Sequence, residues 1–156
     1  MRRREFLGVL GGAATSWPVA ARAQSEPKHS TIELITGAWA FVSSVTVNDK
    51  DGRRSDRWGS DTKGLLIFDR DGHFAQIILR HRSGLQIAKS VSIFGTYSID
   101  PSVKNITMQI DSSSIESASG SIQLRRILSL TEKTLVYETA GVILGEELEA
   151  TWMRFV

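Results

Sequence analysis

From residue 37 onward the chain consists of short runs in which apolar and polar side chains alternate, each bounded by turn-forming residues. The clearest pair is Lys63 to Asp69 (KGLLIFD) and His73 to Arg82, and the Asp-Arg-Asp-Gly turn between them predicts a β-hairpin. Similar runs occupy residues 37–47, 90–100, 105–111, 122–130, 134–139 and 148–156. In the first of these runs, alternation places four apolar side chains on one predicted face, namely Trp39, Phe41, Val45 and Val47.

No long amphipathic helical pattern follows residue 36. Short strands at regular spacing with hairpin-type turns are typical of an antiparallel sandwich or a closed barrel. The pattern therefore predicts an all-β fold of about eight antiparallel strands in one domain, residues 36–156.

The first 23 residues have the layout of a secretory signal peptide. A basic start precedes a short apolar stretch, and Ala21-Arg22-Ala23 fits a small-x-small cleavage site. Arg3-Arg4-Glu5-Phe6-Leu7 resembles a twin-arginine signal, which predicts the twin-arginine export machinery as a partner and a periplasmic or secreted location. Two alternatives remain open: an amphipathic first helix of the fold, and an uncleaved anchor.

Residues 24–35 are interpreted as a tether that contains one proline. Its end, Ser30 to Ile35, predicts a short helix because Ser30 and Glu33 have the spacing of a capping box.

The charge pattern argues against a nucleic-acid partner. Residues 1–23 hold four of the 19 basic side chains and one of the 17 acidic ones, so the rest of the chain is close to neutral. The leader is also too short for a stable membrane span.

Five short motifs resemble, in the same order, those of the bacterial lipocalin-like domain family: Gly37-Ala38-Trp39, Lys63 to Gly72, Phe94 to Asp100 (FGTYSID), Gly120 with Gln123 and Arg125, and Trp152 with Arg154. The resemblance covers residues 36–156 and implies an eight-stranded up-and-down barrel with an interior cavity. It also implies that four residues are structural markers of the fold, with Arg154 stacked on Trp39 at the closed end: Gly37, Trp39, Trp152 and Arg154. The sequence departs from the family pattern at Phe68 and at Thr107-Met108-Gln109.

The sequence contains no recognisable catalytic, cofactor or metal motif. It has no cysteine and no Gly-x-Ser-x-Gly elbow. On a regular strand, His73 and His81 lie roughly 26 Å apart, too far to share a metal ion. A haem-binding barrel would need only one buried histidine, and either of these two is a candidate.

The predicted ligand-binding residues are apolar side chains of the expected barrel wall and two arginines: Phe41, Ile67, Phe74, Ile93, Tyr97, Met108, Arg125 and Arg126. Such a wall favours a small hydrophobic or amphipathic ligand. Arg126 shares its predicted face with Ile122, Leu124 and Leu128, whereas Arg125 matches the family motif. A charge inside the barrel needs a partner, either an acid such as Glu138 or a ligand carboxylate.

Two alternative functions remain open. One is an isomerase- or hydrolase-type enzyme that uses Arg125, Tyr97 and Glu138 in the same cavity, which is an analogy from the fold. The other is a structural or interaction module whose barrel is filled by side chains.

Cleavage after Ala23 makes Gln24 the first residue of the exported protein. N-terminal sequencing of protein recovered outside the cytoplasm is expected to begin at Gln24. A chain that still begins at Met1 would contradict cleavage.

Overall fold

The alternating runs form strands at the positions that the sequence predicts. The computed structural model describes residues 29–47, 52–56, 58–80, 89–139 and 147–155. The elements are α1 (Thr31–Ile35), β1 (Gly37–Val47), β2 (Arg54–Asp56), β3 (Thr62–Phe68), β4 (His73–Arg80), β5 (Lys89–Asp100), β6 (Asn105–Ser113), the 3-10 helix η1 (Glu116–Ala118), β7 (Ile122–Leu130), β8 (Thr134–Thr139) and β9 (Glu147–Arg154). The predicted leader, residues 1–23, lies outside the described residues.

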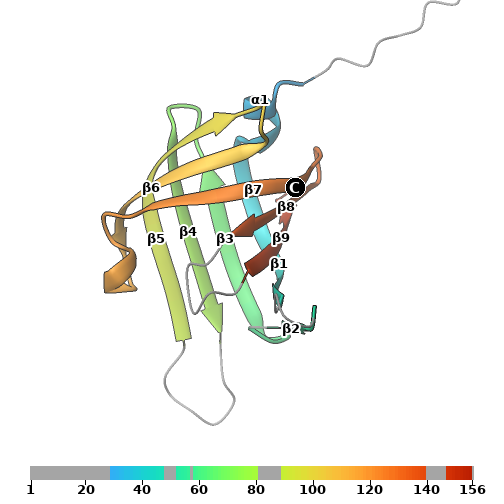
Figure 1. The fold of residues 1–156 in the computed structure, drawn as a ribbon, viewed down its shortest axis with the longest axis vertical. Helices are drawn as coiled ribbons and strands as arrows, with labels where there is room; N and C mark the ends of the chain where they lie inside the picture. The colour runs from blue at the N-terminus through green and yellow to red at the C-terminus, as the bar shows by residue number, and fades with distance from the viewer. Residues whose placement is uncertain (1–28, 48–51, 57, 81–88, 140–146, 156) are drawn as a thin grey trace, which may run out of the picture.

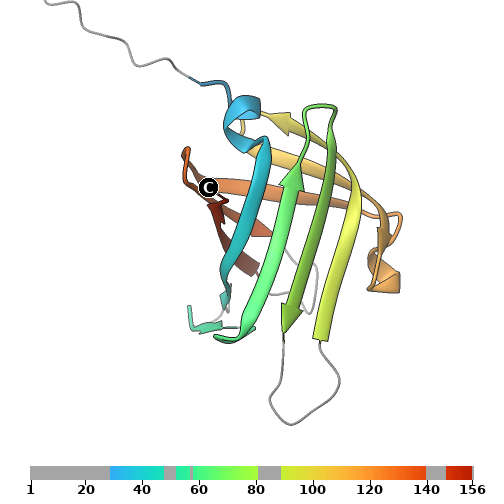
Figure 2. The ribbon, with the colours of Figure 1, turned by 180° about the vertical axis from the view of Figure 1, so that it is seen from behind.

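The strands pair antiparallel with their sequence neighbours, and the sheet closes because β1 also pairs with β9. Eight strands, β1 and β3 to β9, therefore form an up-and-down barrel (Figure 1). The additional strand β2 pairs with the last residues of β1, whereas β3 pairs with the first ones. Figure 2 shows β1, β3, β4 and β5 as one continuous wall. The predicted eight-stranded antiparallel barrel of lipocalin-like type is confirmed.

The hairpin between β3 and β4 depends on the turn chemistry that the sequence shows. The Asp69 carboxylate accepts hydrogen bonds from the backbone N–H groups of Asp71 and His73, at 2.9 and 2.7 Å. Gly72 adopts a φ of 89°, which is accessible to glycine at low cost. These bonds lower the pKa of the Asp69 carboxyl group, the bond from the His73 N–H most of all.

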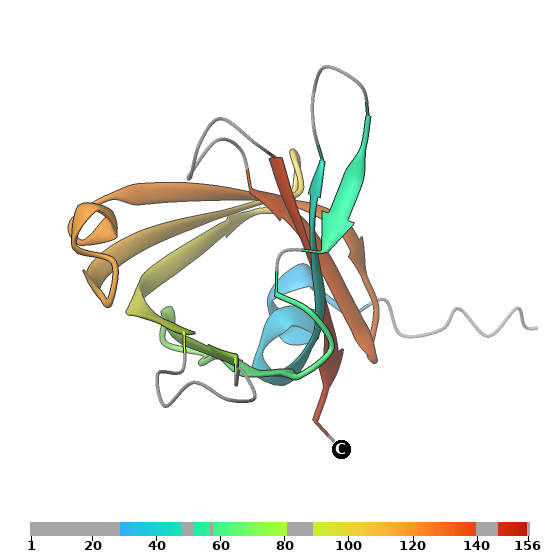
Figure 3. The same ribbon diagram turned by 90° about the horizontal axis from the view of Figure 1, so that it is seen from below.

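The helix α1 lies across one end of the barrel (Figures 1 and 3). Its start has the predicted capping box, because Ser30 accepts from the Glu33 N–H and Glu33 accepts from the Ser30 N–H. Ile35 at its end is fully buried in the core. The last residues of the predicted tether are therefore packed against the barrel and close it at this end.

Trp39 and Arg154 fasten α1 to the barrel. The Trp39 indole N–H donates to the carbonyl oxygen of Ile35 at 2.8 Å, and the Arg154 guanidinium carbon lies 4.2 Å from the centre of a Trp39 ring. Arg154 also donates to the carbonyls of Thr36 and Leu34. These bonds satisfy carbonyls that the end of a helix leaves without partners.

Steric constraints explain why position 37, two residues before Trp39, is a glycine. A Cβ atom at Gly37 would lie 2.5 Å from Nη1 of Arg154, and the φ of Gly37 is 128°. A larger residue would both strain the backbone and displace the arginine. In the structure, Gly37 and Trp39 therefore both lie against Arg154, which agrees with the structural role that the motif resemblance implies for them.

The interior is filled with side chains only toward the α1 end. Fully or nearly fully buried apolar residues gather there, from α1, the start of β1, the β3–β4 hairpin, the end of β5, the start of β6, the start of β8 and the end of β9: Ile35, Trp39, Leu66, Phe68, Phe74, Tyr97, Ile106, Met108, Leu135 and Trp152. The other half of the barrel, near the ends of β1, β4 and β8, is packed less completely.

One prediction about β1 is wrong in its second half. A bulge between Phe41 and Ser43 shifts the register against β9 and exchanges the two faces of the strand. Beyond the bulge, Ser44 and Thr46 are buried in the interior, and the predicted core residue Val45 is only partly buried. Simple alternation cannot locate such an inserted residue.

Replacing Trp39 with alanine should lower the free energy of unfolding by about 3–5 kcal/mol, because it removes a fully buried indole and its hydrogen bond. Urea unfolding of the purified variant measures this change. The matched control is Phe155→Ala, whose exposed ring should cost less than about 0.5 kcal/mol. A loss for Trp39→Ala as small as that of the control would show that Trp39 does not hold the closed end.

Candidate functional site

A cavity of about 910 Å³ occupies the half of the barrel opposite α1. Its wall is formed by side chains from seven of the eight barrel strands, with the segment around η1 and the residues around β2 at its rim: Phe41, Ser44, Thr46, Ser55, Trp58, Gln76, Ile78, Arg80, Val91, Ile93, Ser113, Ile115, Ser117, Ala118, Ser121, Ile122, Gln123, Leu124, Arg125, Tyr137, Thr139, Leu148, Ala150 and Trp152. Because α1 lies across one end of the barrel (Figure 3), a molecule would reach the cavity from the opposite end.

A row of stacked groups crosses the cavity wall from β1 to β7. The Phe41 ring meets Trp152 edge-on at 5.3 Å between centroids, and Trp152 stacks against Tyr137 at 6.4 Å. The Arg125 guanidinium carbon lies 5.5 Å from the centre of the Tyr137 ring. Each member comes from the strand next to its neighbour's, so closure of the barrel sets the order of the row.

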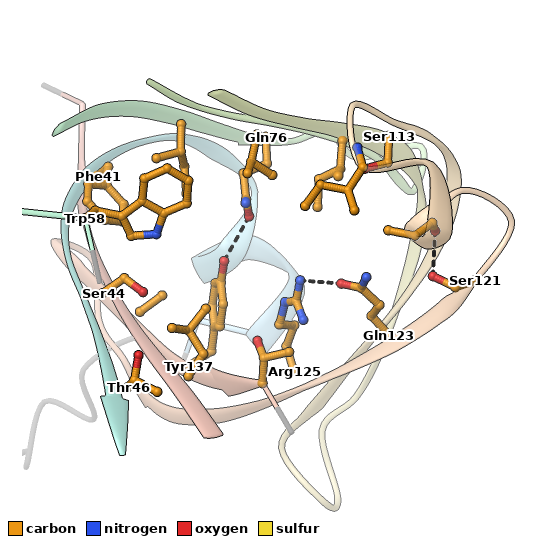
Figure 4. A pocket seen from close by; sticks show the side chains of 18 of the residues that line it. Phe41, Ser44, Thr46, Trp58, Gln76, Ser113, Ser121, Gln123, Arg125 and Tyr137 are labelled. Atoms are coloured by element: carbon orange, nitrogen blue, oxygen red, sulfur yellow. Dashed lines mark hydrogen bonds between the residues drawn. The ribbon is translucent and has the colours of Figure 1, made fainter. Parts of the chain in front are cut away.

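Polar groups of the wall are only partly paired. The Tyr137 hydroxyl and the side-chain oxygen of Gln76 form a 3.0 Å hydrogen bond that crosses the interior from β8 to β4 (Figure 4). The Ser44 and Thr139 hydroxyls and the Trp152 indole N–H are buried without a hydrogen-bond partner among the described residues. Buried polar atoms without partners are rare in proteins, and these three groups are able to bond to a molecule that enters the cavity.

Arg125 is the least satisfied of these groups. It is 5% exposed and points into the cavity from β7 (Figure 4). Its Nη2 donates to the side-chain oxygen of Gln123 at 2.6 Å, but its Nε and Nη1 find no partner within the described parts of the chain. Burial lowers the pKa of Arg125, and Tyr137 opposes that change. An arginine side chain nevertheless stays charged in proteins, so the cost of burying this charge remains.

Three of the predicted ligand-binding residues lie together in the cavity wall: Phe41, Ile93 and Arg125. Three others, Phe74, Tyr97 and Met108, point inward as expected but belong to the filled half near α1. Their strands were placed correctly, but alternation gives the face of a residue and not its depth along the barrel. These three residues therefore belong to the core and not to the cavity wall, contrary to the prediction.

Ile67 and Arg126 do not face the cavity, contrary to the prediction. Ile67 is 39% exposed on the outer face of β3. Arg126 lies on the outer face of β7, its side chain 64% exposed, and forms an ion pair with Glu138. The apolar residues that suggested an inward face for Arg126, namely Ile122, Leu124 and Leu128, are themselves exposed. In β7 the more polar face lines the interior, so the rule that apolar faces point inward fails there.

The sequence reasoning missed Gln76, Gln123 and Tyr137 as wall residues. Gln76 alternates with Phe74 and Ile78, and Tyr137 lies two residues after Leu135, so alternation places both on inward faces. Trp58 reaches the wall from the segment between β2 and β3, where no periodic pattern exists.

The three residues of the predicted enzyme site do not converge. Arg125 lines the cavity, but the Tyr97 hydroxyl donates to the carbonyl of Asp69 at 2.6 Å in the filled half. Burial raises the pKa of Tyr97. Glu138 pairs with Arg126 on the outer face. Only one group of the three is therefore available to a molecule in the cavity.

The described residues hold no group of three or more potential metal ligands from His, Cys, Asp and Glu. His73 is exposed and lies 3.0 Å from the Asp69 carboxylate, whereas His81, the other candidate haem ligand, lies outside the described residues. None of the helices in the described ranges is long and apolar enough to cross a lipid bilayer.

Comparison with known proteins supports the fold. No protein-family model and no curated protein matches the sequence. A biogenic amine-binding protein is similar in structure over 81% of this chain and 67% of its own, with 12% identity and a TM-score of 0.51. Bovine odorant-binding protein in complex with undecanal is 19% identical over 85% of this chain and 78% of its own, with a TM-score of 0.47. A redesigned β-barrel also has a TM-score of 0.47, with 14% identity over 80% of this chain and 95% of its own.

At these identities the likeness shows a shared architecture alone, and the two structures with a TM-score of 0.47 add no argument. The chain has a lipocalin-like eight-stranded antiparallel barrel. Its membership of the bacterial lipocalin-like domain family stays a prediction from the motifs.

Replacing Arg125 with methionine should raise the free energy of unfolding of the ligand-free protein, on the order of 1 kcal/mol, because it removes a buried charge without a counter-charge. Chemical denaturation of protein refolded from denaturant, which removes any bound small molecule, measures the change. The comparison variant Arg126→Met should instead lower stability, because it removes an ion-pair partner of Glu138, whose carboxylate is largely buried. A clear loss of stability for Arg125→Met would contradict this account of an uncompensated charge.

Proposed function

We propose that this protein binds a small hydrophobic or amphipathic molecule in the barrel cavity and acts as a binding protein. The observation that carries this proposal is the cavity of about 910 Å³, which lies in the half of the barrel where a filled core would otherwise continue. Pockets for small molecules typically measure about 300–1,000 Å³ and combine an apolar wall with a few placed polar groups. A structural module with a filled barrel would lack this space.

The composition of the wall supports an apolar ligand. Large aromatic and aliphatic side chains from opposite strands face the space, among them Phe41, Trp58, Ile78, Ile93 and Trp152. Transfer of an apolar molecule from water onto such surfaces is favourable in proportion to the area buried. The polar groups are few, which is typical of sites that orient one end of a ligand.

We further propose that the protein acts outside the cytoplasm, in the periplasm or as a secreted protein. The support is the sequence of residues 1–23, with its Arg3-Arg4 pair, apolar stretch and cleavage pattern. A barrel that encloses its ligand suits a carrier or scavenger of poorly soluble molecules in such a compartment.

Binding in the cavity can be tested by filling it. In the parent protein, the neutral dye N-phenyl-1-naphthylamine should bind with enhanced fluorescence. Ile93→Trp should abolish this enhancement, because Ile93 is buried in the cavity wall and the larger ring occupies the space. The control Ile77→Trp places the same ring on the outer face of the neighbouring strand β4 and should leave dye binding unchanged.

Circular dichroism and thermal unfolding of both variants verify that the barrel is intact. Equal dye binding by the parent protein and a folded Ile93→Trp variant would place binding elsewhere on the protein. No binding of the dye or of any apolar probe by the parent protein would refute the proposed function.

A further inference from the structure

The charge of Arg125 has no counterpart in the cavity. The lining contains two arginines, Arg80 and Arg125, and no aspartate or glutamate among its described residues. Arg125 is 5% exposed, so bulk water screens its charge only weakly. Buried charges in proteins are normally paired, because an isolated one is costly in a medium of low dielectric constant.

Neighbouring groups position Arg125 without neutralising it. Gln123 accepts one hydrogen bond through its side-chain oxygen, and the Tyr137 ring packs near the guanidinium. Burial raises the pKa of Tyr137, although Arg125 opposes this shift, so the phenol is neutral at physiological pH. The adjacent arginine, Arg126, pairs with Glu138 on the outer face, which leaves that acid engaged outside the cavity.

A second unpaired donor lies beside Arg125. Thr139 is its direct cross-strand partner on β8, and both side chains are buried on the inner face. Side chains at such paired positions lie within about 5.5 Å at their Cβ atoms. The Thr139 hydroxyl has no hydrogen-bond partner within the described ranges, as is true of Nε and Nη1 of Arg125. A fixed guanidinium and a free hydroxyl therefore converge at one place on the wall.

We propose that Arg125 and Thr139 bind the carboxylate of an amphipathic ligand whose hydrocarbon part lies against the apolar wall of the cavity. This inference rests on the proposed function and adds the chemical class of the ligand. The planar guanidinium matches the two oxygens of a carboxylate, and charge-assisted bonds of this type are stronger than neutral ones. A single negative charge compensates the single buried guanidinium.

The opposite wall accommodates the rest of such a molecule. Ile78 and Ile93, on β4 and β5, face the cavity, and Trp152 extends the apolar surface on β9. The proposed ligand thus has its charged end on β7 and β8 and its apolar part toward β4 and β5. A cationic ligand is disfavoured, because both charged residues of the described lining are arginines.

Three probes with the same chain separate head-group recognition from apolar binding: decanoate, decanol and decylamine. Their affinities are measured by displacement of N-phenyl-1-naphthylamine and by calorimetry on the delipidated protein. Decanoate should bind at least about tenfold tighter than decanol, because the charge-assisted bonds form only with the carboxylate. Decylamine should bind most weakly of the three.

Two variants test whether Arg125 and Thr139 cause the preference for decanoate over decanol. Arg125→Met should remove the advantage of decanoate while decanol still binds, which also shows that the cavity remains folded. Thr139→Val, which keeps the shape of the side chain, should reduce the advantage by a smaller factor, about two- to tenfold. The control Arg126→Met removes a neighbouring positive charge on the outer face and should keep the full preference.

The outcomes distinguish the two proposals. Equal affinities for decanoate and decanol in the parent protein, or an undiminished preference in Arg125→Met, would overturn carboxylate recognition and leave apolar binding in the cavity standing. Failure of all three probes to bind the parent protein would refute the proposed function and this inference with it.

Discussion

The hydrogen bonds between β1 and β9 join the two ends of one sheet, and the interior exists because of them. Pairing runs from Trp39 opposite Arg154 to the far end of β1, with a single bulge between Phe41 and Ser43. An open sheet would expose two strand edges and one apolar face, whereas a closed sheet pairs its strands all round and faces its inner side chains toward one another. Whether the enclosed space is filled then depends on the side chains at each level of the barrel.

Two levels of the barrel have different physical roles. Near α1 the interior holds large apolar residues such as Trp39 and Phe68, which are fully or almost fully buried. At the other level the wall holds hydroxyls, amides and the charge of Arg125, several of them without partners. Groups that oppose stability are typical of functional sites, and the filled half offsets their cost. Stability and binding are thus separated along the axis of one small barrel.

The strands, the β3–β4 hairpin and the capping box of α1 were predictable, because each depends on residues close together in the sequence. The cavity wall was only partly predictable. Phe41, Ile93 and Arg125 line the cavity, and their role in ligand binding stays a prediction. The bulge in β1 and the reversed polarity of β7 misled the alternation rule for Val45 and Arg126. The depth of Tyr97 and Met108 along the barrel depends on strand register, which long-range pairing determines and local pattern does not.

The contacts of Arg154 also set an order for the formation of the barrel. Its guanidinium bonds carbonyls 118 and 120 residues earlier in the chain, so the ring of strands stays incomplete until β9 has left the ribosome. Contacts between such distant segments carry a cost in loop-closure entropy and slow folding. Until they form, one edge of β1 is free to pair with strands of other chains. Pairing with β9 therefore protects β1 as well as closing the barrel, because it covers a strand edge that would otherwise be exposed.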